Sequence, residues 1–325
     1  MPRLRIRHLT RYRYRTRVGF GEHRFMLRPR EGHDQRVRDF RLMISPAARV
    51  RYRHDVFGNC VGVAEFDARA DVLSFESRVT LDHDPAPIPL DGCETISQAD
   101  LGVPFAYDAE DMADLLRLTQ PAHADPTGAV ADFARGFLRP SGPTPVAAAL
   151  ADMTGAVRER LRYAQRFDGR TQAPAETLAL GSGTCRDYAV LMMEAARALG
   201  LAARFVSGYL YSPPAASGMG APKGGGHTHA WTQVYLPSCG WVEFDPTNGI
   251  VGNRDLIRVA VARDPRQAVP LSGTFFGAGE DSIGMTVSVD VRETRVEAAL
   301  DGSAELTPVV SAAVDAPPRP ALSIA

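Results

Sequence analysis

Residues 181–211 read GSGTCRDYAVLMMEAARALGLAARFVSGYLY, and this stretch decides the fold. Its pattern predicts a short turn, then a helix that starts at or near Cys185, and then a strand. Apolar residues recur at three- and four-residue intervals along the helix and predict one apolar stripe, made of Met192, Met193, Ala196 and Leu199. Gly200 stands where a left-handed helix end favours glycine, and the alternation that starts at Phe205 predicts the strand.

Cys185 is the residue of this stretch that can do chemistry. A cysteine in the first turn of a helix lies against N–H groups without helical partners and near the positive end of the helix dipole. Both features favour the thiolate over the thiol, so the position predicts a cysteine nucleophile. The alternative interpretation is a small buried hydrophobic side chain, which is the one we give to Cys60, Cys93 and Cys239.

Length and composition favour a soluble protein of two domains. The chain has 325 residues, of which 45% are hydrophobic, enough for a sizeable core. Its start lacks the apolar run of a signal peptide, and no stretch approaches the length of a membrane span. The four cysteines form no CxxC pair and no disulfide-type spacing, which favours reduced thiols and a cytoplasmic location.

The net charge of −1 hides an uneven distribution. Residues 1–53 contain 16 arginines and 4 acidic residues, which leaves 21 basic and 34 acidic residues for the remainder. A basic segment is one signature of nucleic-acid binding. Here, however, the arginines between residues 3 and 15 alternate with Leu4, Ile6, Tyr12 and Tyr14. This alternation favours a strand with one solvated face, or docking onto the acidic part of the chain, over nucleic-acid binding.

Residues 1–84 have the pattern of an antiparallel β domain. Short apolar or alternating runs are separated by turn residues, and FGN at 57–59 is typical of a hairpin turn. Several strands without intervening helices predict a β-sandwich-like domain. Pro85, Pro87 and Pro89 then predict a stiff connector.

The rest of the chain mixes helices and strands, so we expect an α+β protein. Short helices are predicted near 109–118 and 127–138, in a connector at 85–144, and a longer helix at 145–162. Strands are predicted at 203–211, 229–236, 240–245, about 255–263 and 283–291. We therefore expect a catalytic core at 145–292 and a flexible C-terminal tail at 293–325.

Two further segments supply groups that complement Cys185. HTHAWTQVYLP places His229 at the start of a strand, and GWVEFDPTNG places Asp245 at the end of the next strand. The intervening SCG predicts a short turn, so both residues should lie at the same end of one hairpin. A carboxylate that accepts from one ring nitrogen leaves the other nitrogen to face Cys185. This arrangement predicts acyl transfer through a covalent acyl-enzyme.

These motifs carry a family resemblance. G-x-C at 183–185, His-Ala-Trp at 229–231 and Phe-Asp-Pro-Thr at 244–247, in this order and spacing, resemble the bacterial transglutaminase-like superfamily, whose members share a papain-like α/β core. YRYRTRV at 12–18, FMLRPREGHDQRVRDFRL at 25–42 and DVFGN at 55–59 resemble the N-terminal region of the bacterial transglutaminase-like cysteine proteases. IRVAVARDPRQAVPLSGTFFG at 257–277 resembles their C-terminal segment, so the resemblance covers most of residues 4–290.

The resemblance implies a papain-like, transglutaminase-core cysteine enzyme with Cys185 as nucleophile, His229 as general base and then acid, and Asp245 as the orienting carboxylate. It implies no metal and no organic cofactor, and the sequence has no recognisable acidic loop for the calcium that some animal transglutaminases use. Groups on this core that acetylate arylamines or deglycosylate peptides match the flanking segments less well. Members that resemble this chain are often encoded near ATP-grasp-like peptide ligases, which implies an isopeptide-type substrate.

The sequence leaves several alternatives at the site. His227 and Glu243 lie two residues from His229 and Asp245, on the same strand faces, but His229 and Asp245 match the family motifs. The HTH sequence also raises a zinc site of Cys185, His227, His229 and Asp245. The backbone N–H of Cys185 is the expected oxyanion donor, and the second donor stays open among Tyr163, Gln165 and Gln172.

The expected activity is cleavage of peptide or protein amide bonds, with the acyl group passed to water or to an amine. We favour hydrolysis, because water at molar concentration outcompetes an amine unless the site excludes it. Residues 212–226, rich in Gly and Pro, form either a mobile flap over the site or a plain surface loop. The alternative function is a non-catalytic protein-binding module in which the β domain docks a partner.

Overall fold

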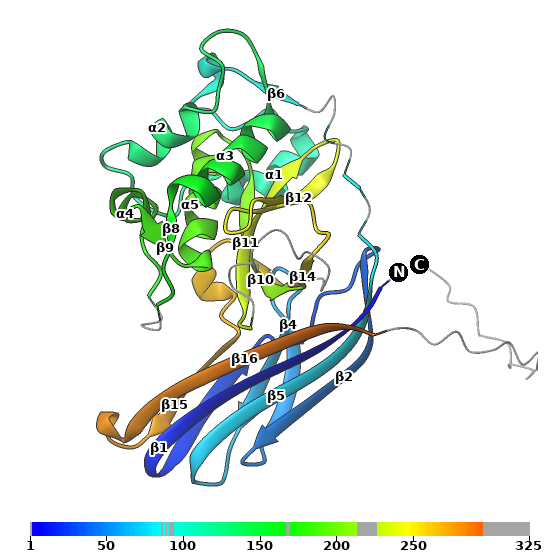
Figure 1. Cartoon of the computed structure of the whole chain (residues 1–325), viewed down its shortest axis with the longest axis vertical. Helices are drawn as coiled ribbons and strands as arrows, with labels where there is room; N and C mark the ends of the chain where they lie inside the picture. Colours follow the sequence, from blue (N-terminus) through cyan, green and yellow to red (C-terminus); the bar gives the residue numbers. More distant parts are fainter. Residues whose placement is uncertain are drawn as a thin grey trace, which may run out of the picture. The chain divides into compact units, whose positions relative to one another are not determined.

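The helix predicted after the opening turn is α5, Cys185–Ala198, and it lies at the centre of the core (Figure 1). The structure, a computed structural model, describes residues 2–85, 87–88, 90, 94–166, 170–212 and 226–294. The Thr184 hydroxyl accepts from the Asp187 N–H, and the Asp187 carboxylate accepts from the Thr184 N–H. This reciprocal capping fixes the first turn of α5, where Cys185 lies.

The surroundings of α5 correct the prediction of a single apolar stripe, because every residue from Asp187 to Arg197 is buried. Four helices and the core sheet pack around α5; the helices are α1 (Ala109–Thr119), α2 (Ala129–Arg135), α3 (Val146–Arg160) and α4 (Pro174–Leu180). Glu194 and Arg197 are buried as an ion pair of 2.6 Å, and Arg197 also donates to the carbonyl of Ala203. This pairing makes the burial of two charges tolerable.

A five-stranded antiparallel sheet in the order β13–β12–β11–β10–β14 forms the other half of the core (Figure 1). Its strands are β10 (Ala203–Leu210), β11 (His229–Leu236), β12 (Gly240–Asp245), β13 (Ile250–Val251) and β14 (Leu256–Ala262). They confirm the four longer strands predicted for this region. Helix α5 packs on one face, while Val206, Trp231 and Val261 form a cluster with Phe57 on the other.

The N-terminal region is a curled antiparallel sheet organised by one very long strand, β1 (Arg3–Phe25). The first half of β1 pairs with β5 and β16, and the second half with β4 and β15. The strands besides β1 are β2 (Gln35–Ser45), β3 (Arg49–His54), β4 (Cys60–Glu65), β5 (Ala70–His83), β15 (Leu271–Phe276) and β16 (Ser282–Thr294). Tyr14, Phe25 and Phe75 belong to an aromatic-rich core between these halves. We predicted a β-sandwich-like domain. The structure instead has one sheet that curls over, and β1 takes part in both of its halves.

The last two strands differ from the predicted domain boundaries. We expected residues 271–292 within the catalytic core, but β15 and β16 both pair with β1. Alternation predicts that a segment is a strand, yet it does not specify the partner. Residues 2–294 form one unit, and the shorter elements are β6 (Thr95–Ile96), η1 (Gln98–Asp100), β7 (Thr144–Pro145), β8 (Arg162–Tyr163), β9 (Ser182–Gly183), η2 (Pro265–Gln267) and η3 (Gly279–Asp281).

Buried polar contacts join the curled sheet to the core. The Asn59 side chain, in the β3–β4 turn, donates to the Val261 carbonyl and accepts from the Val261 N–H. It thereby makes the two backbone hydrogen bonds that a neighbouring strand would make at the edge of β14. His8 of β1 and Tyr209 of β10 share a hydrogen bond of 3.0 Å. These contacts place β16, the neighbour of β1, beside the core strands.

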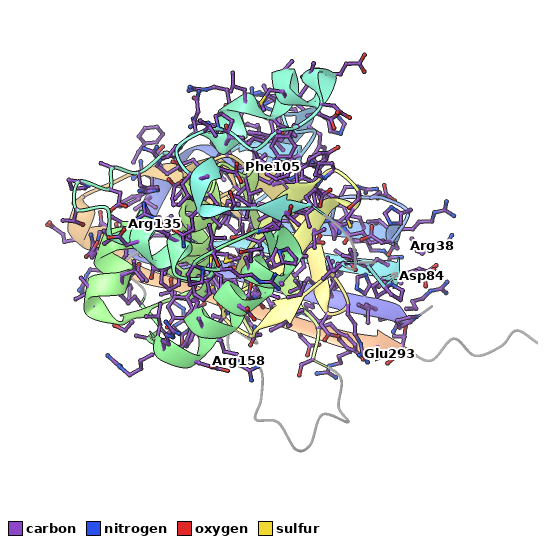
Figure 2. All side chains as sticks on the ribbon, turned by 90° about the horizontal axis from the view of Figure 1, so that it is seen from above. Arg38, Asp84, Phe105, Arg135, Arg158 and Glu293 are labelled. Atoms are coloured by element: carbon purple, nitrogen blue, oxygen red, sulfur yellow. The ribbon has the colours of Figure 1, made fainter. Side chains whose placement is uncertain are left out.

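Leu4 and Ile6 of β1 are buried, as the alternation predicted. Arg3 and Arg7, on the other face, donate to the carboxylates of Asp82 and Glu76. Arg3 and Arg38 both bind Asp82. Figure 2 shows Arg38, with Arg135 and Arg158, at the periphery of the molecule. The two Asp82 pairs join a buried carboxylate to arginines that are partly exposed, so solvent and salt screen them in part.

Within the described ranges, no helix has the length and apolarity needed to cross a membrane. Cys93, most of the predicted flap at 212–226 and most of the predicted tail at 293–325 lie outside the described residues.

Candidate functional site

The β11–β12 hairpin brings His229 and Asp245 together. The two strands pair antiparallel from Thr232 opposite Phe244 to Leu236 opposite Gly240, so the start of β11 lies at the end of β12. His229 Nε2 donates to Asp245 Oδ2 over 2.8 Å, and both side chains are fully buried. This is the contact that the motif positions predicted.

Asp245 is held by its own turn. Its Oδ1 accepts from the Thr247 N–H at 2.9 Å, and its Oδ2 accepts from the Asn248 side chain at 2.8 Å. Burial alone would raise the pKa of Asp245, but His229, followed by Asn248 and the Thr247 N–H, lowers it below its ordinary value. Sequence reasoning missed Asn248, although an Asp two to three residues before polar turn residues is a recognised turn pattern.

The free nitrogen of His229 points to the chemistry of the site. Burial alone would lower the pKa of His229, but the Asp245 carboxylate and then the Cys185 sulfur more than offset this and raise it to about 10. Cys185 therefore lies close enough to stabilise the imidazolium. Nδ1 itself is buried and makes no regular hydrogen bond with the described residues. Catalytic hydrogen bonds often align only when substrate binds.

A hydrogen bond crosses the packed interface between the cysteine helix and the histidine strand. The Thr232 hydroxyl donates to the Ala189 carbonyl at 2.7 Å, in the buried interface between α5 and β11. Ala189 lies one helical turn after Cys185, and Thr232 lies three residues after His229. Trp231 stacks on the His229 ring with centroids 6.0 Å apart. Cys185 and His229 thus lie on two elements that pack directly against each other, α5 and β11.

Cys185 and His229 line one cavity of about 420 Å³. Tyr163 and Gln165 line it as well, so both stay available as a second oxyanion donor. Burial, together with the neighbouring Cys185 and Tyr188, raises the pKa of Tyr163 to about 12, so its hydroxyl keeps its proton at neutral pH. The backbone N–H of Cys185, at the start of α5, has no hydrogen-bond partner in the described part of the chain.

Asp187 organises the opposite wall, which sequence reasoning did not single out. Its carboxylate accepts from Thr184 twice, from Arg166 at 2.8 Å and from the Gln172 N–H at 2.7 Å. The Gln172 side chain lies against Thr177 and is buried. Gln172 is therefore committed to the structure of this wall and does not line the cavity.

The rival residues fall in other places. Glu243 binds Gln233 and Arg258, so it belongs to a structural network. His227 lines the cavity, but the histidine bonded to Asp245 is His229. In the described residues, no group of three or more His, Cys, Asp or Glu side chains could hold a metal ion, and this includes the four residues of the zinc alternative.

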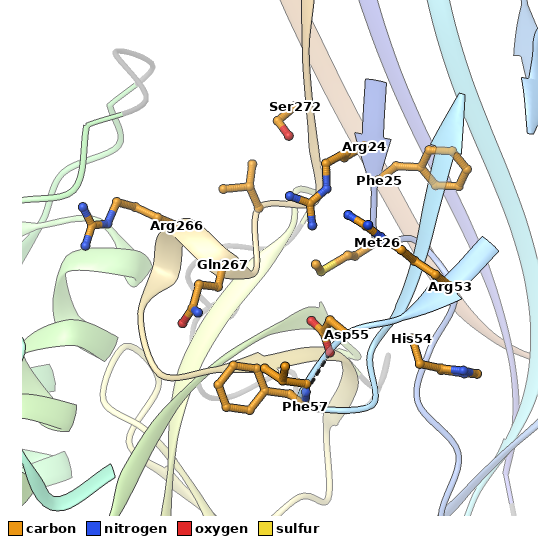
Figure 3. A pocket seen from close by; sticks show the side chains of 12 residues that line it. Arg24, Phe25, Met26, Arg53, His54, Asp55, Phe57, Arg266, Gln267 and Ser272 are labelled. Carbon is orange, nitrogen blue, oxygen red and sulfur yellow. Dashed lines mark hydrogen bonds between the residues drawn. The ribbon is translucent and has the colours of Figure 1, made fainter. Parts of the chain in front are cut away.

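A second cavity of about 410 Å³ contains none of the predicted site residues (Figure 3). Arg24, Arg53 and Arg266 line it, and Asp55 is bonded to the Phe57 N–H there. Val269, in the segment after η2, borders both cavities, so this segment separates the second cavity from the one that contains Cys185. Its lining offers arginine side chains but no cysteine.

Comparisons with known proteins agree with the motifs. Residues 4–82 match the bacterial transglutaminase-like N-terminal region, and residues 132–246 match the transglutaminase-like superfamily. An uncharacterized protein of Mycobacterium tuberculosis is 30% identical over 299 residues, which are 89% of this chain and 92% of that protein. An uncharacterized protein of Mycobacterium leprae is 26% identical over 291 residues, which are 89% of this chain and 99% of that protein.

A solved structure shows a similar fold across both regions. The crystal structure of a candidate cysteine protease from Cytophaga hutchinsonii matches with a TM-score of 0.65 and 18% identity, over 90% of each chain. It supports the combination of a β-rich N-terminal region and a papain-like core in one fold. The chain therefore belongs to the transglutaminase-like superfamily and carries the bacterial transglutaminase-like N-terminal region.

Proposed function

We propose that this protein is a cysteine-dependent enzyme that hydrolyses amide bonds of peptides or proteins through a Cys185–His229–Asp245 triad. The observation that carries the proposal is the buried His229–Asp245 bond, with the remaining ring nitrogen unbonded in the cavity that holds Cys185. The Cys185 sulfur also contributes to the raised pKa of His229, so the two reactive groups lie near each other. Family membership adds support at the level of a cysteine-dependent enzyme.

The first half of the reaction forms a thioester. The Cys185 thiolate, favoured by the N-terminus of α5 and by the His229 imidazolium, attacks the carbonyl carbon, and a carbon–sulfur bond forms. The backbone N–H of Cys185 stabilises the oxyanion, with Tyr163 or Gln165 as the second donor. His229 Nδ1 then gives its proton to the leaving nitrogen, and the carbon–nitrogen bond breaks.

The second half releases the acyl group. Neutral His229 takes a proton from water, the hydroxide attacks the thioester carbonyl, and the carbon–sulfur bond breaks to restore the thiolate. Asp245 keeps the ring orientation through both proton transfers. We favour water over an amine as the acceptor because the cavity of about 420 Å³ is partly open to solvent and gives water access.

Alkylation with iodoacetamide tests the activated thiolate. The Cys185 rate, followed by peptide mapping, should be fast and nearly independent of pH between 6 and 8. Cys60 provides an internal reference, because burial raises the pKa of its thiol. The His229→Ala variant should reduce the Cys185 rate to that of an ordinary thiol.

The matched control is His227→Ala, since His227 lines the same cavity but is not bonded to Asp245. It should keep the fast rate. If wild-type Cys185 reacts no faster than Cys60, the thiolate is not activated and the non-catalytic binding module becomes the better interpretation. A covalent acyl adduct trapped on Cys185 from lysate, and identified by mass spectrometry, would name the substrate.

A further inference from the structure

One edge of β16 borders the cavity that holds Cys185. β16 pairs with β1 along its other edge, and no further strand of the described residues pairs with it. Gly284, Met285 and Val287 line the same cavity as Cys185 and His229. The curled sheet therefore supplies one wall of the candidate active site.

The backbone direction along this edge follows from one hydrogen bond. The Val289 N–H donates to the Gly226 carbonyl at 2.8 Å, and so it faces away from β1. In an antiparallel strand, every second residue turns its N–H and C=O to the same edge. Met285 and Val287 therefore also face away from β1, and none of the described residues accepts from or donates to their backbone on that side.

Two large apolar side chains of β16 near this edge are exposed to solvent. Ile283 and Met285 are exposed, at 59% and 53%. Open strand edges are usually protected by charged residues or proline. Residues 282–288, SIGMTVS, contain neither, whereas Asp290, Arg292 and Glu293 follow on the half of β16 beyond the cavity. The unprotected half is thus the half that borders the cavity.

We propose that the substrate binds as an extended peptide that adds to the edge of β16, with backbone hydrogen bonds to Met285 and Val287 that lay its scissile amide against Cys185. This inference rests on the proposed function, because it specifies how that site takes its peptide. Gly226, three residues before His229, already bonds to the same edge, so pairing there continues directly into the site. Main-chain pairing of this kind gives affinity with broad tolerance of side chains.

The test uses a peptide electrophile and its N-methylated analogues. Acetyl-trialanyl chloromethyl ketone alkylates Cys185 with loss of chloride, and three analogues each carry one N-methyl group. The rate constant for each reagent is divided by the iodoacetamide rate of the same protein. N-methylation of a reagent residue whose N–H donates to β16 should lower this ratio roughly fivefold, which corresponds to the loss of one hydrogen bond. N-methylation of a residue whose N–H faces away from β16 should change the ratio little.

The protein offers a matched pair of variants on the same edge. Val287→Pro removes one N–H beside the cavity, and Val291→Pro removes the equivalent N–H beyond the Gly226 contact. Proline is tolerated where an edge N–H faces away from the sheet, and both valines are partly buried against the same core cluster. Only Val287→Pro should lower the ratio, roughly fivefold.

Equal ratios for the two proline variants, or no alternation among the methylated reagents, would overturn the proposal. The same holds if sedimentation shows that a second copy covers this edge in wild type and is released by Val287→Pro. Slow reaction of wild-type Cys185 with iodoacetamide would instead refute the proposed function. Fast iodoacetamide reaction without a preference for the peptide reagent refutes the strand addition alone.

Discussion

Two fully buried carboxylates flank the start of α5, and their surroundings differ in one respect. Asp187 pairs with the Arg166 guanidinium, which stays charged. Its other donors are the Thr184 hydroxyl and two backbone N–H groups, which do not exchange protons at neutral pH as an imidazole does. Asp245 pairs with His229, whose second nitrogen is buried without a regular hydrogen bond. A closed network holds a structure, whereas a network with one open position can move a proton. The comparison assigns Asp187 to positioning, whereas the proposed mechanism assigns Asp245 to orienting the histidine that moves the proton.

The largest effect is expected from Asp187→Ala. It removes the acceptor of four hydrogen bonds and leaves Arg166 without this counter-ion at a buried wall. We expect a loss of about 3 kcal/mol in the free energy of unfolding, measured by urea denaturation.

Glu176→Ala is the control for this variant. Glu176 also binds an arginine of the same wall, Arg170, but that pair is exposed to solvent. Its loss should cost much less stability than the loss of Asp187. Similar losses for both variants would contradict the positioning role of Asp187.

Asp245→Asn tests the chemical side of the comparison. Asn keeps an acceptor for His229 Nε2 but removes the charge that offsets burial, so the pKa of His229 falls. Without the imidazolium, the Cys185 thiolate loses its nearest positive charge, and its iodoacetamide rate should fall roughly thirtyfold.

The matched control is Glu243→Gln, two residues earlier in β12. Glu243 is buried and paired with Arg258, but it makes no contact with His229. The alkylation rate of Cys185 in the folded variant should therefore stay at the wild-type value. A loss in both variants would mean that any buried charge in β12 supports the thiolate.

The short-range part of the site could be predicted from the sequence. A helix start at Cys185 and a tight turn between two strands are local patterns, and the β11–β12 hairpin delivers His229 to Asp245 through its register. The motif positions then selected His229 over His227. The four longer core strands, and residues 3–15 of β1, followed from alternation in the same way.

The long-range part could not be predicted. The 23 residues of β1 have two partners on each side, and nothing in the alternation of β16 specifies that it pairs with β1, at the other end of the chain. Glu194 and Arg197 look like a surface pair at helical spacing, yet helices from elsewhere in the chain bury them. Asp187 was invisible for the same reason, because Arg166 and Gln172 reach it from a separate segment.

The comparison also predicts how stability depends on pH. Folded His229 has a pKa of about 10 against an ordinary value of 6.5, so the stabilisation from its pair is complete below pH 6.5 and is lost as pH rises toward 10. The pKa of Asp245 is lowered, so its contribution is present above 3.8 and is lost as pH falls through the folded value. Wild type should therefore lose its stability advantage over His229→Gln between pH 7 and 10 in urea denaturation. A constant difference over that range would mean that His229 is neutral in the folded protein.

The smallest effect is expected from the hydrogen bond between Thr232 of β11 and Ala189 of α5. Thr232→Val keeps the shape but removes the donor, so unfolding should become easier by about 1 kcal/mol. Because this bond sets α5 against β11, the alkylation rate of Cys185 should fall a few-fold as well, while the pH range of the reaction stays unchanged. Thr232→Ser keeps the hydroxyl and should preserve the rate. If Ser and Val lower the rate equally, packing of the Thr232 methyl group, rather than the hydrogen bond, holds Cys185 in register with His229.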